Sequence, residues 1–360
     1  MYNLKNIKKI ELEITSACNA ACPGCARTQN LDILKINSIT LADIKRLFPD
    51  TEYIKDKQFK FCGVLGDPIL NKECLEMVEY LSTRGGYCQL STNGGYQNAK
   101  WWSRLGELSL QTNNVDIHFC IDGHKDTNHI YRVNTNFEVI TRNMKAYSEG
   151  GNSNASATWI YIVFDHNEHE LDNAKEHAKQ LGFNFATRTG MRNSYHQWVS
   201  SIKAKNRSTN KIETTEKVIT TTGKKEHSKK DQVKTLVKIV NDFENNNVDP
   251  KIIDNVVSSV TCKYVHEKEI FISSDLKLWP CCFLWDSYFK NKENIKDKFI
   301  DFKENWNCLN SKSIDEILKD KWYQETLELS WNLLHNMHIK RCILTCAYNK
   351  AYHNEIKIEN

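Results

Sequence analysis

The sequence predicts an α/β protein built on a parallel sheet, followed by a smaller part that carries cysteines. Two observations lead to this prediction. Apolar, β-rich runs alternate with amphipathic helical patterns through about residue 190, which is typical of parallel sheets whose connections are helices. The chain also has 360 residues, more than one core usually fills. We therefore expect an open doubly wound sheet or a barrel-like one, and a second domain.

The strands and helices of the first part follow from their patterns. Six runs are predicted to be strands: residues 8–15, 59–65, 87–91, 115–121, 157–164 and 183–188. Helical patterns lie between them near residues 40–48, 72–83, 98–108, 136–148 and 168–181. Gly182 follows the last of these helices, where a glycine ends a helix well.

The alternation stops near residue 200. Residues 203–232 are rich in Lys, Thr and Asn and contain no aromatic residue, which is typical of a linker or a surface insert. Beyond it we expect a short strand pair within 268–280 and helices near 313–334. The predicted division is a core at 1–199, a polar, basic linker or insert at 200–255 and a C-terminal domain at 256–360.

Composition restricts the class of protein. The N-terminus lacks a secretory signal and no run of 18 apolar residues occurs, so we expect a cytoplasmic protein with no membrane segment. Thirteen cysteines in a reducing compartment favour metal ligation over disulfides.

Part of the chain's formal net charge of +4 at pH 7 is concentrated in one segment. Residues 201–235 hold ten Lys or Arg against four Asp or Glu. Such a stretch can attract phosphate or acidic partners. A solvated linker is the simpler interpretation, and binding of nucleic acid is not expected.

Residues of types that are common in binding sites and turns follow each predicted strand. Ligands of parallel α/β proteins bind at the carboxyl ends of the strands, so these residues are candidates for one site. In chain order they are Cys18, then Gly66, Asp67 and Pro68, then Ser91 and Asn93, then Asp122, then Asp165 and His166, and finally Arg188. Turn formation explains any one of them alone.

Three cysteines, Cys18, Cys22 and Cys25, follow the first strand at the spacing C-x3-C-x2-C. A structural zinc site usually has four protein ligands, and a four-iron cluster normally takes four thiolates. Three thiolates leave one iron open for a small molecule. A zinc ion completed by a distant His or Cys is the alternative.

The stretch "CNAACPGC" resembles the signature of the radical S-adenosylmethionine (radical SAM) superfamily. The resemblance covers roughly residues 8–190. It implies a partial (β/α)6 barrel of the TIM type, and a [4Fe–4S] cluster on Cys18, Cys22 and Cys25 whose open iron binds S-adenosylmethionine. It also implies reductive cleavage of S-adenosylmethionine to a 5′-deoxyadenosyl radical, which abstracts hydrogen from a substrate C–H bond.

Further elements extend the resemblance. "LGDP" (65–68) is similar to the family's Gly-Gly-Glu-Pro element, with Leu65 and Asp67 in place of Gly and Glu. "STNGG" (91–95) and "CIDG" (120–123) are similar to the elements that line the cofactor and the substrate. Arg188 is a candidate partner for the carboxylate of S-adenosylmethionine, and a surface arginine is the alternative. The expected cofactor-binding residues are thus Gly66, Asp67, Pro68, Ser91, Asn93, Asp122 and Arg188.

The C-terminal cysteines suggest a second cluster. Cys262 and Cys281 bracket the predicted strand pair, and Cys342 and Cys346 follow about sixty residues later. Four thiolates can close an iron–sulfur cluster or a zinc site. The arrangement resembles the single-cluster, twitch form of the SPASM extension of radical SAM enzymes. Cys282 is the substitute for Cys281, and Cys308 is expected to be a buried apolar cysteine.

The sequence therefore predicts a radical SAM oxidoreductase with an auxiliary [4Fe–4S] cluster that aids electron transfer or substrate binding. The resemblance implies an electron donor such as flavodoxin or ferredoxin. The substrate class is a peptide or protein, or a small molecule that is dehydrogenated. The alternative is a non-catalytic iron–sulfur or zinc protein that binds nucleic acid or a partner through the basic insert.

Overall fold

The computed structural model describes residues 3–152, 154–189, 198–205, 212–219, 227–244, 249–291, 295, 305–350 and 355–358. It divides into two compact units. The larger one comprises Leu12–Gly223 and Asn354–Asn360, and the smaller one Met1–Glu11 and Lys224–His353. Each unit therefore combines segments that are far apart in the sequence.

The larger unit is built on a sheet with the strand order β1-β2-β3-β4-β5-β6-β11. Strand β1 (Lys9–Leu12) contributes only its last residue, Leu12, to this unit, because Lys9–Glu11 belong to the smaller one. The other strands are β2 (Gln58–Phe61), β3 (Tyr87–Thr92), β4 (Val115–Cys120), β5 (Ser156–Tyr161), β6 (Asn184–Thr189) and β11 (Glu355–Ile358). Strands β2 to β6 are parallel neighbours, whereas β11 pairs antiparallel with β6. The six predicted strands are confirmed.

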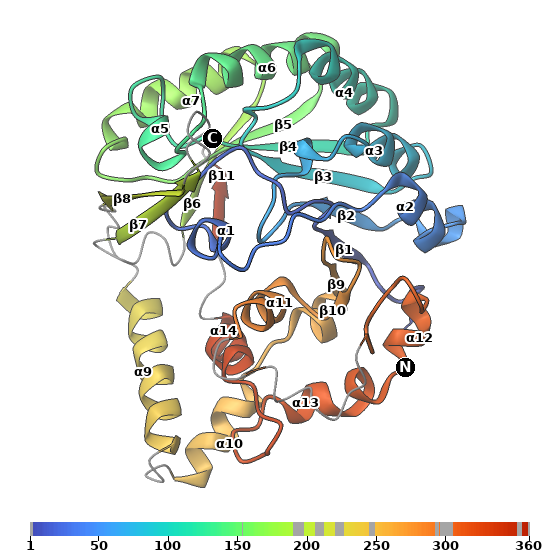
Figure 1. Cartoon of the computed structure of the whole chain (residues 1–360), viewed down its shortest axis with the longest axis vertical. Helices are drawn as coiled ribbons and strands as arrows, with labels where there is room; N and C mark the ends of the chain where they lie inside the picture. The colour runs from blue at the N-terminus through green and yellow to red at the C-terminus, as the bar shows by residue number, and fades with distance from the viewer. Residues whose placement is uncertain are drawn as a thin grey trace. The chain divides into compact units, whose positions relative to one another are not determined.

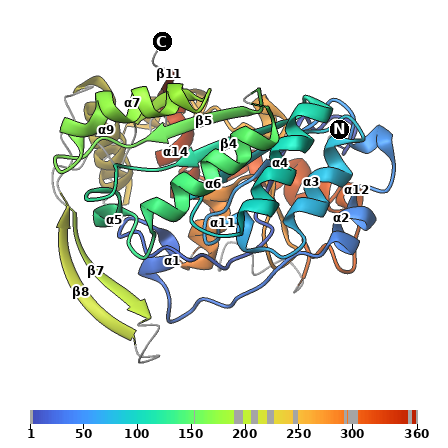
Figure 2. The ribbon, with the colours of Figure 1, turned by 90° about the horizontal axis from the view of Figure 1, so that it is seen from above.

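Helices connect these strands and cover one face of the sheet. They are α1 (Ala26–Gln29), α2 (Leu41–Leu47), α3 (Cys74–Ser82), α4 (Ala99–Thr112), α5 (Asn128–Tyr131), α6 (Phe137–Gly150) and α7 (Leu171–Gln180). Side-chain caps fix several starts: Thr40 caps α2, Asn98 caps α4 and Asn136 caps α6. Figures 1 and 2 show α3, α4 and α6 side by side along the outside of the sheet. This is the expected partial (β/α)6 barrel.

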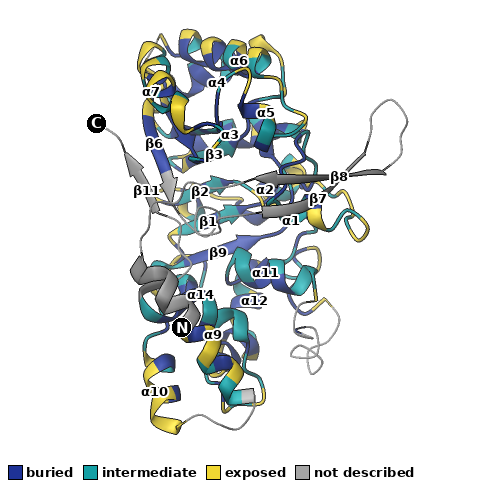
Figure 3. Ribbon diagram, turned by 90° about the vertical axis from the view of Figure 1, so that its left-hand side faces the viewer, coloured by how far each residue is buried: buried dark blue, intermediate teal, exposed yellow. Residues whose placement is uncertain are grey.

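The core of this unit lies between the sheet and its helices. Phe119 of β4 stacks on Phe183 with ring centroids 5.6 Å apart, and it contacts Trp102 of α4 and Tyr147 of α6. Figure 3 shows exposed residues on the outer sides of α6 and α7. Gly182 has a φ of +74° just after α7, so the predicted helix end is confirmed.

Strands β7 (Trp198–Lys205) and β8 (Ile212–Ile219) form a separate antiparallel pair. They fall within or beside the range predicted as a linker. The segment alternates β-branched and polar residues, such as "IETTEKVI", which is a strand pattern.

The smaller unit is mainly helical. It contains α9 (His227–Glu244), α10 (Pro250–Ser258), the π-helix η4 (Lys263–Glu267), the antiparallel strands β9 (Glu269–Ile272) and β10 (Leu278–Trp279), then α11 (Cys282–Phe289), α12 (Ile314–Leu318), the π-helix η6 (Trp322–Thr326), α13 (Leu327–Leu329) and α14 (Lys340–Lys350). The strand pair and the helices near 313–334 are as predicted.

Helices α9 and α10 occupy part of the range predicted as a polar linker. Leu236 and Val240 of α9, and Ile253 and Val256 of α10, are buried in one apolar cluster. Their spacing of three or four residues places them on one helical face. An apolar stripe among many lysines is therefore enough to bring these helices into the core of the smaller unit.

Among the residues that the structure describes, no helix is both long and apolar enough to cross a membrane.

Candidate active site

The three cysteines of the C-x3-C-x2-C motif lie together in the loop before α1. Cys22 is buried in a cluster with Tyr131 and Phe164, and Cys18 and Cys25 pack against this cluster. Burial raises the pKa of the Cys18 thiol, and the charges of Asp67, Cys22 and Cys25 raise it further. Because buried thiols with raised pKa values deprotonate only beside a strong positive charge, a metal suits this group.

The loop after β2 reaches the loop after β3 through Asp67. Its carboxylate accepts hydrogen bonds from the Thr92 hydroxyl at 2.8 Å, and from the backbone and side-chain nitrogens of Asn93 at 2.8 and 2.6 Å. Burial raises the pKa of Asp67, while the hydrogen bonds from Asn93 and Thr92 oppose this. Asp67 therefore holds two carboxyl-end loops together.

Asn93 links these loops to the cysteine motif. Its Nδ2 lies 2.9 Å from Oδ1 of Asn19 and 3.9 Å from Sγ of Cys18. Its Oδ1 accepts a hydrogen bond from the backbone N–H of Gly95 at 2.8 Å. Asn93 is buried, so its amide orients the cysteine loop from inside the protein.

Gly66 allows the β2 loop to approach the cysteine loop closely. A Cβ atom there would lie 1.8 Å from the carbonyl oxygen of Thr15, and the N–H of the next residue, Asp67, donates to the carbonyl of Ala17 at 2.9 Å. Only glycine fits this contact. Pro68 then begins the short 3₁₀-helix η2 (Pro68–Leu70).

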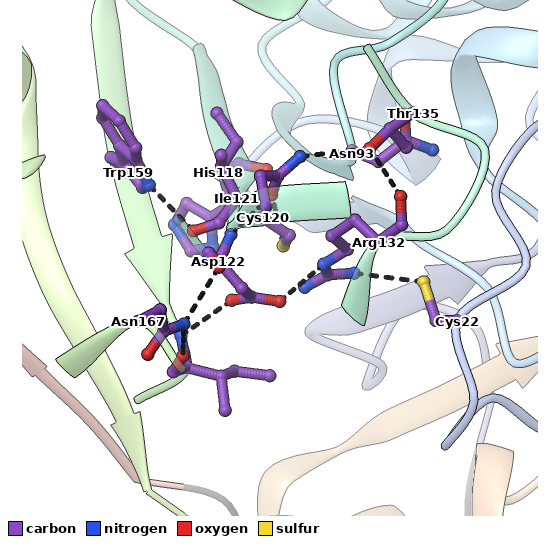
Figure 4. A network of polar contacts seen from close by, with 12 residues as sticks. Cys22, Asn93, His118, Cys120, Ile121, Asp122, Arg132, Thr135, Trp159 and Asn167 are labelled. Atoms are coloured by element: carbon purple, nitrogen blue, oxygen red, sulfur yellow. Dashed lines mark hydrogen bonds and ion pairs between the residues drawn. The ribbon is translucent and has the colours of Figure 1, made fainter. Parts of the chain in front are cut away.

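A buried ion pair lies beside the motif (Figure 4). Nε of Arg132 donates to Oδ2 of Asp122 at 2.6 Å, and its Nη1 lies 4.0 Å from Sγ of Cys22. Asp122 is fully buried, and its Oδ1 accepts from the backbone of Ile162 at 2.8 Å. Burial opposes the charge of Arg132, but Asp122 and Cys22 raise its pKa well above the usual range.

Arg132 is not among the site residues that the sequence pattern predicts. The one available signal was an arginine ten residues after Asp122, in a loop that follows a strand. The other predicted residues occupy the expected strand ends: Ser91 is half-buried on β3, opposite His118. The side chain of Arg188 on β6 lies outside the described residues. Contact of any of these residues with a cofactor stays a prediction.

A second cysteine group lies in the smaller unit. Cys262, Cys281, Cys342 and Cys346 line one pocket, together with Lys263 and Arg341. Burial raises the pKa of Cys342, and the charges of Cys281, Cys346 and Cys262 raise it further. The four thiols are therefore close enough to interact.

Two cysteines of this group, Cys262 and Cys281, each lie directly before a helical segment. Cys281 is the N-cap of α11, and Cys262 precedes η4 in the same way. The backbone N–H groups of the following residues act to lower the pKa of both thiols, yet burial and the charge of Cys262 raise the pKa of Cys281 to about 12. Cys342 and Cys346 lie four residues apart on one face of α14.

The remaining cysteines are less uniform than predicted. Cys308 is half-buried, so the expectation that it is a buried apolar cysteine is wrong. It forms an isolated antiparallel bridge with Lys277. Neither Cys308 nor Cys282 is among the residues that line the pocket.

Neither cysteine group, as the described residues place it, has the geometry of a site for a single metal ion. Within the described ranges, no three or more His, Cys, Asp or Glu side chains are placed to hold one metal ion. The fit to a metal group therefore rests on the chemistry of the donors, which are buried or half-buried thiols.

One family model matches the part of the chain that contains the parallel sheet. Residues 12–178 match the family model described as the radical SAM superfamily, and no match was found among curated proteins. The fold resembles that of histidine-tagged anSMEcpe with bound AdoMet, with 15% identity, a TM-score of 0.48, and coverage of 91% of this chain and 84% of that one.

Two further solved structures are similar at a greater distance. Streptococcus suis SuiB bound to the precursor peptide SuiA shares 12% identity at a TM-score of 0.48, over 90% of this chain and 67% of SuiB. BtrN in complex with AdoMet and 2-DOIA shares 10% identity at a TM-score of 0.42, over 96% and 97%. These likenesses are too distant to support an argument about substrate.

The family match defines the class of the matched segment. Residues 12–178, somewhat less than half of the 360-residue chain, form a radical SAM domain.

Proposed function

We propose that the chain cleaves S-adenosylmethionine reductively and abstracts hydrogen from a substrate C–H bond. In this proposal Cys18, Cys22 and Cys25 hold a [4Fe–4S] cluster with one open iron. The observation that carries it is the convergence of these thiols with Asn93 and Arg132, at the carboxyl ends of the parallel strands. When bound, the cluster and S-adenosylmethionine supply the electron transfer and the bond cleavage.

The surrounding residues prepare this chemistry. Asn93 orients the loop of Cys18 through its hydrogen bond to Asn19. The guanidinium of Arg132 places a positive charge beside Cys22, which favours a thiolate there. Tyr131, Ile162 and Phe164 surround the motif with apolar side chains, and so exclude water from a site where reactive species form.

We propose further that Cys262, Cys281, Cys342 and Cys346 hold an auxiliary [4Fe–4S] cluster of the twitch type. All four line one pocket, whereas Cys282 is absent from its lining. A four-iron cluster with four thiolates has no open iron, so this cluster suits electron transfer or support of a substrate site. An electron donor such as flavodoxin or ferredoxin would reduce the first cluster.

The first experiment measures 5′-deoxyadenosine released from S-adenosylmethionine by the reconstituted chain under dithionite. The Cys18→Ala, Cys22→Ala, Cys25→Ala variant should release none, while Cys308→Ser should match the parent chain. Release that persists in the triple variant would contradict the proposal. Absence of release from the fully loaded parent chain would favour a non-catalytic iron–sulfur protein, unless a peptide or small-molecule substrate restores release.

Iron analysis tests the second cluster separately. The parent chain and Cys308→Ser should each bind about eight irons, and replacement of Cys262, Cys281, Cys342 and Cys346 by alanine should leave about four. About four irons in the parent chain, or one zinc ion in the smaller unit, would contradict the auxiliary cluster and leave the first one untouched.

A further inference from the structure

Three buried polar groups around the pocket of the smaller unit have no hydrogen-bond partner among the described residues. They are Nε1 of Trp331, Nε of Arg341 and Oγ1 of Thr345. The three residues all line the pocket that contains the four cysteines. Their positions therefore coincide with the proposed auxiliary site.

Such groups are costly in a folded protein. A buried donor without a partner loses its hydrogen bond to water and gains none in return, and most buried polar groups in native proteins are hydrogen-bonded. Three of them at one pocket indicate a missing acceptor inside it. Trp331 and the Nε of Arg341 can only donate, so the occupant must present acceptor atoms.

The sequence places these donors beside the ligands. Arg341 and Thr345 each directly precede a cysteine of α14, at Cys342 and Cys346. Trp331 packs against the apolar cluster that includes Cys346. The donors thus reach the pocket from two segments, α14 and the turn after α13.

Two cationic side chains, Lys263 and Arg341, also line the pocket. The guanidinium of Arg341 lies 5.3 Å from the ring centroid of Phe283, and Nζ of Lys263 lies 5.9 Å from the same centroid. Lys263 pairs with Glu269 at 3.0 Å. A group with four thiolates is anionic and accepts hydrogen bonds at sulfur, which matches both the donors and the charge.

We propose that Trp331, Arg341 and Thr345 donate hydrogen bonds to sulfur atoms of the auxiliary cluster and thereby raise its reduction potential. This inference rests on the proposed auxiliary cluster. Reduction adds a negative charge to the cluster, so donors stabilise the reduced state more than the oxidised one. The three residues are positioning residues, which tune the cluster without ligating iron.

The test is a redox titration of the auxiliary cluster, followed by electron paramagnetic resonance. The full-length Cys18→Ala, Cys22→Ala, Cys25→Ala variant serves as the parent, since its spectrum comes from one cluster alone. Trp331→Phe and Thr345→Val each remove one donor and preserve most of the side-chain volume. Trp285→Phe is the matched control, because Nε1 of Trp285 is also buried without a partner among the described residues but does not line the pocket.

We expect each pocket variant to keep its iron and to disfavour reduction about tenfold, which equals a fall of about 59 mV for a one-electron couple. Trp285→Phe should leave the potential unchanged. Exchangeable protons coupled to the cluster in electron–nuclear double resonance should become fewer in Trp331→Phe and in Thr345→Val.

Three outcomes would overturn the inference in distinguishable ways. Unchanged potentials and proton couplings in both pocket variants, with iron retained, would refute the hydrogen bonds alone. A parent that binds no iron in the smaller unit would refute the auxiliary cluster together with this inference. An equal fall in Trp285→Phe would show that the effect is general repacking, and would also refute the hydrogen bonds.

Discussion

The ion pair between Arg132 and Asp122 shows how single residues shape the candidate active site. A buried charge pair gains little net stability over apolar packing, because both groups lose their hydration. Here the carboxylate also caps the backbone at Ile162, and the guanidinium extends to Cys22. The pair is therefore better explained by its position beside the cysteine motif than by stability alone.

Replacing Arg132 by Met should lower the free energy of unfolding by about 3–5 kcal/mol, because Asp122 is left as an unpaired buried charge. The double variant Arg132→Met, Asp122→Asn should recover part of this loss. Urea unfolding followed by tryptophan fluorescence measures both changes.

Arg104 provides the control for this prediction. It pairs with Glu79 and Glu107 on the surface, so Arg104→Met should cost less than about 1 kcal/mol. An equal loss in the two arginine variants would show that the buried pair has no special role.

At the scale of elements, glycines set how closely helices α4 and α6 pack. A Cβ at Gly106 of α4 would lie 2.1 Å from the carbonyl oxygen of Tyr147, and a Cβ at Gly150 of α6 would lie 2.1 Å from that of Ser103. Each helix thus places a glycine against the backbone of the other.

Gly106→Ala should destabilise the protein, although alanine favours a helix by about 1 kcal/mol relative to glycine. Overpacking against a backbone oxygen costs about 1–3 kcal/mol or more, and the helices would have to separate. Thermal unfolding measures the difference, with Leu110→Ala as the control, since Leu110 is exposed on the same helix. A Gly106→Ala variant as stable as its parent would contradict this packing.

The loop after β4 and helix α7 meet through two stacked histidines. The rings of His124 and His177 lie 5.9 Å apart and are nearly parallel. Burial lowers the pKa of both, and the charge of His124 lowers that of His177 further. Glu170, whose carboxylate lies 3.8 Å from Nδ1 of His124, partly opposes the shift of His124.

These lowered pKa values predict a dependence of stability on pH. Near pH 6.5 the unfolded chain binds more protons at these histidines than the folded one, so stability falls as the pH drops through about 6.5. The fall should level off below the folded pKa values. His177→Gln should therefore lose less stability than its parent between about pH 7.5 and about pH 5.5.

Urea unfolding at several pH values checks this prediction. His129→Gln, at an exposed position on α5, is the control and should keep the pH dependence of the parent. Identical pH profiles for the His177 variant and its parent would contradict the role of the stacked pair.

At the scale of the whole molecule, the two units are expected to depend on metal differently. The core of the smaller unit includes Cys346 and packs α9, α10 and α14 together. The larger unit has an extensive sheet and an aromatic core of its own. Because metal binding contributes to folding where ligands come from distant segments, the smaller unit should need its metal more.

Removing iron with a chelator under anaerobic conditions should therefore loosen the smaller unit first. Hydrogen exchange should accelerate in α10 and α14 while β3 and β4 keep their protection, and limited proteolysis should cut within residues 224–353. The untreated iron-loaded chain is the control. Loss of protection in β3 and β4 before α14 would contradict the expectation.

The sequence alone determined the elements of the larger unit and the cysteine motif. The strands and helices can be predicted from the local periodicity of apolar residues. Cys18, Cys22 and Cys25 lie within eight residues, so their shared loop keeps them close together. The sequence pattern did not indicate α9 and α10, because they follow or overlap the Lys-, Thr- and Asn-rich residues 203–232, whose composition is typical of a linker.

Only the tertiary structure decided the contacts between distant segments. Arg132 reaches Cys22 across 110 residues of sequence, and Trp331, Arg341 and Thr345 line the pocket of the four C-terminal cysteines. The spacing of residues along the chain does not predict these side-chain contacts, because the contacts depend on how whole helices and strands pack. Local pattern thus fixed the elements and the motif, whereas long-range packing selected the side chains that surround the cysteines.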